Sequence, residues 1–356
     1  MKNAVFLLIF AAAAAANPIY TVADLGGIDG SATGYAINSS GTVAGWAQNP
    51  SGGQQAFVST PSGLQALASG PYESYAYGIN DSGTVVGTTY DANGQAHATI
   101  WSPSGTTVLG AGSYAMAINA AGEVVGGNGQ AFAVVNGQVQ GLSSVAGINW
   151  SAAYGVNSGG TVVGDGQLAN GTFRAIIWNP DGSTSLLGTL GGNSSQATGV
   201  NNSGEVVGFA SLADGYQNAF AEIGGTLLDL GTLGGGSSYA YGINSSGEIV
   251  GYSWLADGGQ SAFLYDDGTL LDLNSLLPSN SGWDLLQAYA INDSGQITGV
   301  GLFDGQLSAF VLTDPPAGPA DIAAVPEPRM WFVLGATLAM IAVLRPRRAS
   351  AGLGRP

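Results

Sequence analysis

The feature that most constrains the fold is a short motif that returns seven times along the chain. Each copy has an apolar residue, an asparagine, two small or polar residues, a glycine and then a β-branched run, as between Tyr77 and Gly87. Asparagine at the first position of a type I turn caps its own backbone, and glycine at the fourth position accepts a positive φ. Each copy therefore predicts two strands joined by a tight turn. The turn residues are Asn38 and Gly41, Asn80 and Gly83, Asn119 and Gly122, Asn157 and Gly160, Asn201 and Gly204, Asn244 and Gly247, and Asn292 and Gly295.

A second pattern lies further along each repeat and predicts two more strands. It is an Ala-Phe pair in five repeats, and an alanine followed by a run that ends in tryptophan at Ala98 and Ala175. A glycine turn such as Asp266 to Gly268 follows, and then another apolar run. Each repeat therefore predicts four short strands. The five pairs end in Phe57, Phe132, Phe220, Phe263 and Phe310.

The asparagine spacings of 42, 39, 38, 44, 43 and 48 residues match the period of propeller blades. The last repeat stops after its third strand, near Thr313, and an unpaired strand from Tyr20 to Leu25 stands at the start of the body. Pairing these two ends would close the ring and leave no exposed blade edge. We therefore predict an all-β fold, a seven-bladed β-propeller of four-stranded blades over residues 17–314. An open solenoid would need separate caps at its ends.

The charge is strongly acidic and excludes one class of function. Between Asn17 and Ala324 the sole basic residue is Arg174, and all 23 acidic residues except Glu327 lie in that stretch, which gives a formal charge of about −21. Such a surface repels phosphate backbones, so nucleic-acid binding is excluded. The chain has no cysteine, which removes thiolate metal sites and thiol redox chemistry.

Both chain ends carry signals for export. Residues 1–16 combine Lys2, an apolar run and small residues at Ala14 and Ala16, so we predict a signal helix that is cleaved near Ala16. After a Pro/Ala linker at 315–324, residues 325–350 contain a Pro-Glu-Pro motif, an apolar helical segment at 330–344 and a basic cluster. The segment is short for a membrane span, and the basic end is expected to stay cytoplasmic. The motif is Val325, Pro326, Glu327 and Pro328, and the basic stop is Arg345, Arg347 and Arg348.

The order of motif, apolar segment and arginine cluster resembles the PEP-CTERM sorting signal of Gram-negative bacteria. The resemblance covers about 25 residues and implies an exosortase as processing partner, transient insertion of residues 330–344 in the inner membrane, and a link with exopolysaccharide. The repeats resemble those of the HAF-repeat extracellular proteins in phrases such as Asp229 to Gly235 and Ser261 to Tyr265. The histidine of that tripeptide is replaced here, for example by Gln55 or Ser261. The second resemblance implies an extracellular location and no agreed activity.

Candidate sites for metals and catalysis each have a structural alternative. His97 is the single histidine, so repeated catalytic triads and multi-histidine metal sites are excluded, and a structural role is expected for it. Acidic loops offer oxygens to Ca²⁺, although aspartate before glycine is also ordinary turn chemistry and no loop has the full spacing of a known calcium site. We therefore predict no cofactor and keep Ca²⁺ as the open alternative. The acidic loops are Asp91 to Gly94, Asp214, Asp257, and Asp266 with Asp267.

Repeated glutamates and aromatic residues also have both a structural and a functional interpretation. Glu123, Glu205 and Glu248 occupy one slot after the turn glycine in three repeats, which favours a shared structural role over the two distinct carboxylates of a glycosidase. Seven aromatic side chains either pack between blades or form stacking platforms for sugars. These are Trp46, Tyr77, Trp101, Tyr154, Trp178, Tyr241 and Trp254.

The sequence as a whole predicts an exported cell-surface or extracellular-matrix protein with a binding or structural role, associated with exopolysaccharide, and not an enzyme. The alternative from another class is a polysaccharide hydrolase or lyase built on the propeller.

Overall fold

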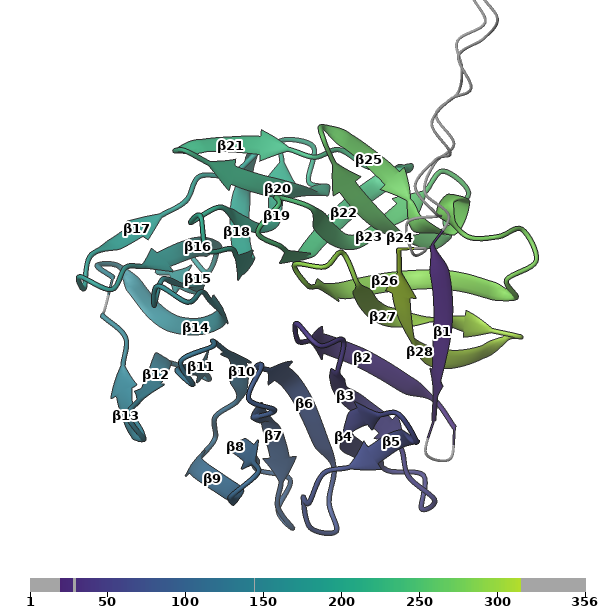
Figure 1. The fold of residues 1–356 in the computed structure, drawn as a ribbon. Coiled ribbons are helices and arrows are strands. Elements are labelled where there is room, and N and C mark those ends of the chain that lie inside the picture. Colours follow the sequence, from purple (N-terminus) through teal and green to yellow (C-terminus); the bar gives the residue numbers. More distant parts are fainter. Residues whose placement is uncertain (1–19, 28–29, 144, 315–356) are drawn as a thin grey trace, which may run out of the picture. The chain divides into compact units, whose positions relative to one another are not determined.

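The described strands form a ring of seven antiparallel sheets. The computed structural model describes residues 20–27, 30–143 and 145–314, and in this part 28 strands build seven four-stranded sheets (Figure 1). The first strand of each repeat lines the centre of the ring, and the following strands lie successively further out. The prediction of an all-β, seven-bladed propeller is confirmed.

We number the blades from the first complete repeat. Blade 1 is β2 (Ala32–Ile37), β3 (Val43–Gln48), β4 (Gln54–Thr60) and β5 (Gly63–Ala66); blade 2 is β6 (Ser74–Ile79), β7 (Val85–Tyr90), β8 (Ala96–Ser102) and β9 (Gly105–Ala111); blade 3 is β10 (Ala115–Ile118), β11 (Val124–Gly127), β12 (Ala131–Val135) and β13 (Gln138–Gly141). Blade 4 is β14 (Ile148–Val156), β15 (Val162–Leu168), β16 (Phe173–Trp178) and β17 (Thr184–Leu186); blade 5 is β18 (Gly191–Val200), β19 (Val206–Leu212), β20 (Gln217–Ile223) and β21 (Thr226–Asp229); blade 6 is β22 (Gly234–Ile243), β23 (Ile249–Leu255), β24 (Gln260–Asp266) and β25 (Thr269–Asp272).

Blade 7 takes its strands from both ends of the repeat region. It consists of β26 (Trp283–Ile291), β27 (Ile297–Phe303), β28 (Gln306–Thr313) and, as the outermost strand, β1 (Thr21–Gly26). The pairing of β1 with β28 is antiparallel, with Thr21 opposite Thr313. Ring closure by the N-terminal strand is therefore confirmed. The strand begins and ends one residue later than the predicted Tyr20 to Leu25. Every strand of the ring lies between Thr21 and Thr313, so residues 17–314 hold all seven sheets.

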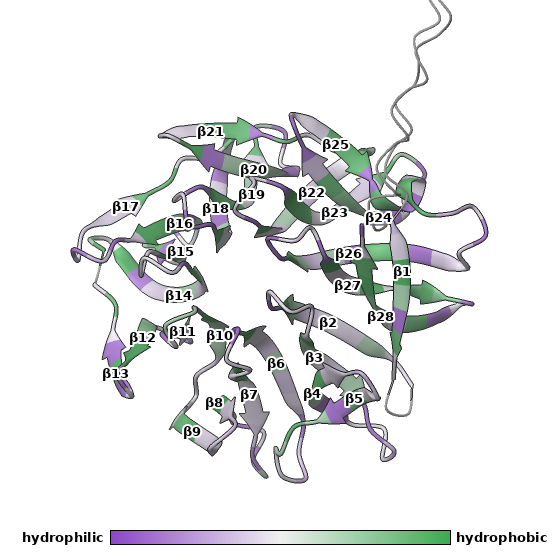
Figure 2. Ribbon diagram, viewed as in Figure 1, coloured by the Kyte–Doolittle hydropathy of each residue, from purple (hydrophilic) through white to green (hydrophobic). Residues whose placement is uncertain are grey.

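The apolar core lies between neighbouring blades. One cluster joins Val163 and Ala175 of blade 4 to Ala197, Val206 and Phe220 of blade 5, and the other clusters are built in the same way. Figure 2 shows inner strands such as β2 and β6 mostly in intermediate colours and the outer strand β13 as hydrophilic, and β13 is exposed along its length. Since each blade buries its faces against its neighbours, the stability of the propeller depends on every blade being in place.

The phenylalanine of the Ala-Phe pair fills the centre of a blade interface. Phe57, Phe220, Phe263 and Phe310 are all 0% exposed. Phe263 lies directly opposite Gly251 of the second strand. A Cβ at Gly251 would lie 1.9 Å from the Tyr239 carbonyl oxygen and 2.8 Å from the Phe263 ring. The glycine is required because the inner strand and the ring both approach the backbone at this point.

The connection from blade 6 to blade 7 contains a short helix that the repeat pattern did not predict. This 3₁₀ helix, η1 (Leu273–Leu276), is capped by the Asp272 side chain, which accepts a hydrogen bond from the Asn274 N–H. Its carbonyl at Leu276 accepts a hydrogen bond from the Tyr20 N–H at 3.0 Å, and Tyr20 is 3% exposed. The helix therefore helps to fix the residue that precedes β1. The described part of the chain contains no helix with the length and hydrophobicity of a membrane span.

Candidate functional site

The seven motif asparagines form a closed ring of hydrogen bonds around one end of the central channel. Each side-chain amide donates to the main-chain oxygen of the asparagine in the next blade, with N···O distances of 2.9–3.3 Å. The bond from Asn292 to Asn38 completes the circle. Each side-chain oxygen also accepts from the N–H groups two and four residues later, at 2.9–3.2 Å. The motif is therefore both a turn and a joint between blades.

Polar residues four positions after the asparagine support this ring. Oε2 of Glu123 accepts from the Asn119 amide at 3.1 Å, and Glu205 does the same for Asn201 at 2.6 Å. Glu248 makes the equivalent bond with Asn244. The structure thus gives the three glutamates one shared structural role at the asparagine ring.

Asn157→Asp is expected to destabilise the propeller by about 2–3 kcal/mol, because the new carboxylate faces the Asn201 carbonyl instead of donating to it. Both turn bonds to the side-chain oxygen would survive. Asn49→Asp is the matched control, since Asn49 makes the same two turn bonds at an outer turn. Urea unfolding of both variants checks this. Equal midpoints would show that the inter-blade bond contributes nothing.

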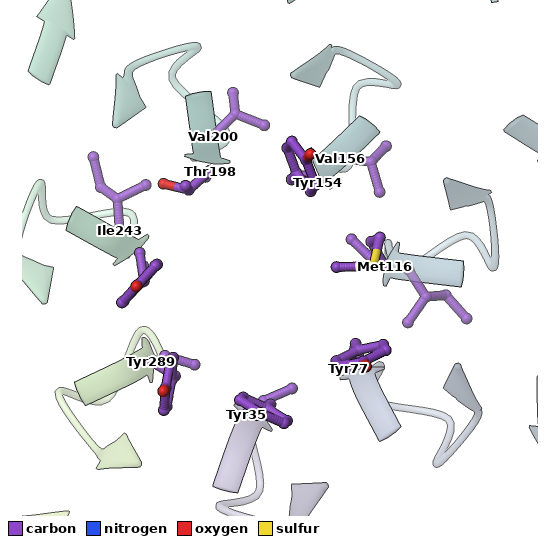
Figure 3. Close-up of a pocket in the computed structure, with 18 of the residues that line it drawn as sticks. Tyr35, Tyr77, Met116, Tyr154, Val156, Thr198, Val200, Ile243 and Tyr289 are labelled. Carbon is purple, nitrogen blue, oxygen red and sulfur yellow. The ribbon is translucent and has the colours of Figure 1, made fainter. Parts of the chain in front are cut away.

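A bulge in the first strand of every blade directs one side chain into the channel. The register of the first two strands shifts at the residue three positions before the asparagine in all seven blades. β-Bulges redirect a side chain in this way. The side chains converge on a common space of about 520 Å³ (Figure 3). They are Tyr35, Tyr77, Met116, Tyr154, Thr198, Tyr241 and Tyr289.

Burial raises the pKa of each ring tyrosine above its ordinary value, so the five phenols stay neutral and keep their hydroxyl donors. The ring continues into a longer series of aromatic contacts with centroid distances of 4.8–6.1 Å. In order of contact the series is Tyr90, Tyr75, Tyr77, Tyr35, Tyr289, Tyr241, Tyr252, Tyr239 and Phe209.

The remaining predicted aromatic residues divide between core and surface. Trp101 and Trp178 are each 4% exposed, and their indole N–H groups donate to the carbonyls of Ala68 and Ser143. These two are packing residues. Trp254 is 38% exposed on β23, and Trp46 contacts the ring of Tyr75.

Three of the four predicted acidic loops form turns through their own carboxylates. Asp91 accepts from the N–H groups of Asn93 and Gln95 and from the His97 ring at 3.2 Å, and the backbone bonds are the main reason that its pKa is lowered. Asp214 and Asp257 each accept from the N–H two residues later. Within the described ranges, no three His, Asp or Glu side chains gather closely enough to hold a metal ion.

A separate pocket lies at the junction of blades 4 and 5, near the start of the inner strands and therefore away from the asparagine ring. Its volume is about 360 Å³, within the range of small-molecule sites. It shares Tyr154 and Gln196 with the wall of the central channel. Four aromatic side chains and several polar groups line it. They are Trp150, Tyr154, Asp165, Phe173, Ser194, Ser195, Gln196, Phe209 and Gln217.

Asp165 is the unusual residue of this pocket. It lies on β15 and is 3% exposed. Its Oδ2 accepts from the Gln196 amide at 2.9 Å, whereas Oδ1 has no hydrogen-bond partner among the described residues. Burial raises the pKa of the carboxyl to about 7, against the effect of the Tyr154 hydroxyl and the Gln196 amide, which lower it. Buried polar atoms are normally paired, so the unpaired oxygen of a pocket-lining carboxyl group requires an explanation.

The raised pKa makes stability depend on pH. Between about pH 4 and 7 the folded protein holds a proton on Asp165 that the unfolded chain has released, so stability falls as pH rises and levels off above the folded pKa. We expect Asp165→Asn to stabilise the propeller by a few kcal/mol at pH 8 and to have little effect at pH 4. Thermal melts of both proteins across this range check it. If the difference in melting temperature between the two proteins were the same at every pH, Asp165 would not be a buried, ionisable group.

Sequence reasoning did not single out Asp165, although a signal was present. Eight residues after the motif asparagine, blades 1, 5 and 6 carry Trp46, Phe209 and Tyr252, and blade 4 carries Asp165 at the same place. Blades 2, 3 and 7 carry Thr88, Gly127 and Val300 there, so Asp165 is the one charged residue among the seven equivalent positions. Such local violations are expected at functional sites.

Several predicted segments lie outside the described residues. These are the signal at 1–16, the linker at 315–324 and the sorting signal at 325–350, including the Pro-Glu-Pro motif and the arginine cluster.

Comparison with known proteins gives the fold alone. No family model and no curated protein sequence matches the chain. Among solved structures, a puromycin-hydrolysing peptidase of Mycobacterium tuberculosis has a TM-score of 0.52 and 13% identity over 79% of this chain and 50% of that chain. This chain therefore spans about half the length of that peptidase. A gluconolactonase of Xanthomonas campestris has a TM-score of 0.41 and 13% identity over 84% and 95% of the two chains. A lectin of Burkholderia pseudomallei has a TM-score of 0.42 and 10% identity over 85% and 97%.

Proposed function

We propose that this protein is an exported binding protein whose propeller holds a carbohydrate in the pocket between blades 4 and 5. The observation that carries the proposal is the composition of the pocket wall. The aromatic rings of Trp150, Phe173 and Phe209 lie beside a buried carboxylate with an unpaired oxygen and the Gln196 amide. A pocket of this kind combines apolar contact with a few polar groups that fix orientation.

A sugar ring matches this wall in shape and chemistry. Its C–H faces are apolar and pack on aromatic rings, while its edge carries hydroxyls that donate and accept hydrogen bonds. Trp150 and Phe173 meet edge to face, with centroids 5.8 Å apart and planes at 84°. They form a corner of the pocket wall, and Phe209 on the neighbouring blade lines the same pocket. Phe209 in turn contacts the ring of Tyr239, with centroids 4.9 Å apart.

Binding without turnover is supported by the number of carboxylates in the pocket wall. Asp165 is the one carboxylate among the described lining residues. Hydrolysis of a glycosidic bond ordinarily uses two carboxyl groups on opposite sides of that bond. The proposal therefore favours a binding protein over a polysaccharide hydrolase.

The cellular part of the proposal rests on the two chain ends. Signal cleavage near Ala16 and exosortase processing at the Pro-Glu-Pro motif would deliver the propeller to the cell surface or matrix, and exopolysaccharide is the carbohydrate that the resemblance to the sorting signal implies. Replacing Pro326, Glu327 and Pro328 by alanine is expected to leave the tail uncleaved in cells. Normal processing of that variant would remove the sorting part of the proposal.

The binding claim is tested by screening the purified propeller, residues 17–314, on an array of neutral, acidic and amino glycans. Trp150→Ala is expected to weaken binding about tenfold or more. Trp254→Ala is the matched control, since Trp254 is an exposed tryptophan on blade 6 outside the pocket. Equal losses in both variants would place the site elsewhere. Release of reducing sugars with turnover would replace the proposal by an enzyme.

A further inference from the structure

Asp165 is a buried carboxylate that forms no ion pair with a positively charged side chain in the described part of the protein. Arg174 is the sole lysine or arginine in that part, and its guanidinium donates to the main-chain oxygens of Asn193 and Phe173. The ion pair found there is between His97 and Asp91 on blade 2. Buried acidic groups are almost always paired. The partner of Asp165 is therefore to be sought outside the protein.

The surroundings of Asp165 favour a ligand that donates hydrogen bonds. Asp165 lines the pocket, its buried Oδ1 has no hydrogen-bond partner among the described residues, and its Oδ2 accepts from the Gln196 amide. Tyr154 on β14 is the other titratable group in the wall, and the lining residues from blade 5 are serine, glutamine and phenylalanine. The propeller also carries an excess of carboxylates over its single guanidinium. Its field attracts cations and repels uronic acids and sulfated or phosphorylated sugars.

We infer that the pocket between blades 4 and 5 selects an amino sugar with a free, protonated amine, and that Asp165 is the residue that binds this amine. This inference rests on the proposed carbohydrate site and names its ligand class. The ammonium group donates to Oδ1, and the aromatic corner of Trp150 and Phe173 covers one face of the ring. An N-acetylated sugar carries no charge at this position and loses the ion pair.

The test compares three trisaccharides by calorimetric titration of the propeller at neutral pH. They are the β-1,4-linked trimers of glucosamine, N-acetylglucosamine and glucose. The glucosamine trimer is expected to bind about 10- to 100-fold more tightly than the other two, as for a hydrogen bond to a charged group. Asp165→Asn should remove this preference. Asp257→Asn is the control, because it deletes the same charge from an exposed turn on blade 6 and should keep the preference.

The outcomes separate the inference from the proposed function. Equal binding of all three trimers, lost in Trp150→Ala, would overturn the amine inference and leave the carbohydrate site. If the preference for the glucosamine trimer persisted in Asp165→Asn, the acidic surface as a whole would account for that preference. The role of Asp165 would then be overturned. Binding of none of the trimers, together with an empty glycan array, would overturn both. Because Asp165→Asn is expected to be more stable than the parent at this pH, loss of binding in it cannot be ascribed to unfolding.

Discussion

A chain that lacks residues 20–26 is expected to fail to form the closed propeller and to accumulate as aggregate. These residues supply the outer strand of blade 7 and the buried side chain of Tyr20, which packs with Leu285 and Leu312. Their loss leaves β28 as an unpaired edge and opens the ring at one interface. The expected loss exceeds about 5 kcal/mol, which is comparable to the stability of a whole domain.

Thermal melting and size-exclusion chromatography of this deletion, beside the intact propeller, measure the effect. A synthetic peptide of residues 19–27 provides the control, since adding it in excess should restore the missing strand by pairing with β28. An unchanged melting temperature for the deletion would show that ring closure through β1 is wrong.

Phe263→Ala is expected to cost about 3–5 kcal/mol, the range for a fully buried aromatic ring. The side chain is 0% exposed and packs with Val207 and Ala219 of blade 5, so its removal leaves a cavity at a blade interface. The more conservative Phe263→Leu should cost less than the alanine variant.

Equilibrium unfolding in urea gives these values from the midpoint and slope. Ile223→Ala serves as the reference, because Ile223 is 47% exposed at the end of β20 and its truncation should change stability by less than about 0.5 kcal/mol. Similar midpoints for Phe263→Ala and Ile223→Ala would contradict a core built on the Ala-Phe pairs.

The fold was predictable because the sequence repeats its local signals seven times. A tight turn at Asn80 and Gly83 is weak evidence alone, yet seven such turns at blade spacing specify the propeller. Closure was predictable because the strand missing from the last repeat is found at the start of the body. The helix η1 was not predicted, since it occurs in one connection and has no counterpart in the other repeats.

The candidate site was much less predictable. The turn chemistry of the motif asparagines can be read locally, but the bonds from Asn157 to Asn201 and from Asn292 to Asn38 depend on how blades sit side by side. The tyrosine ring depends on a bulge, which the alternation of residues does not reveal. Asp165 required a comparison of equivalent positions across blades, because aspartate near glycine otherwise suggests a turn.

The most direct measurement of the central claim is a crystal structure of the propeller soaked with the glycan that binds most tightly on the array. The account predicts one sugar unit between Trp150 and Phe209, with a donor group within hydrogen-bond distance of Asp165 Oδ1. A sugar bound only in the central channel or on the outer strands, with the pocket between blades 4 and 5 unoccupied, would contradict it.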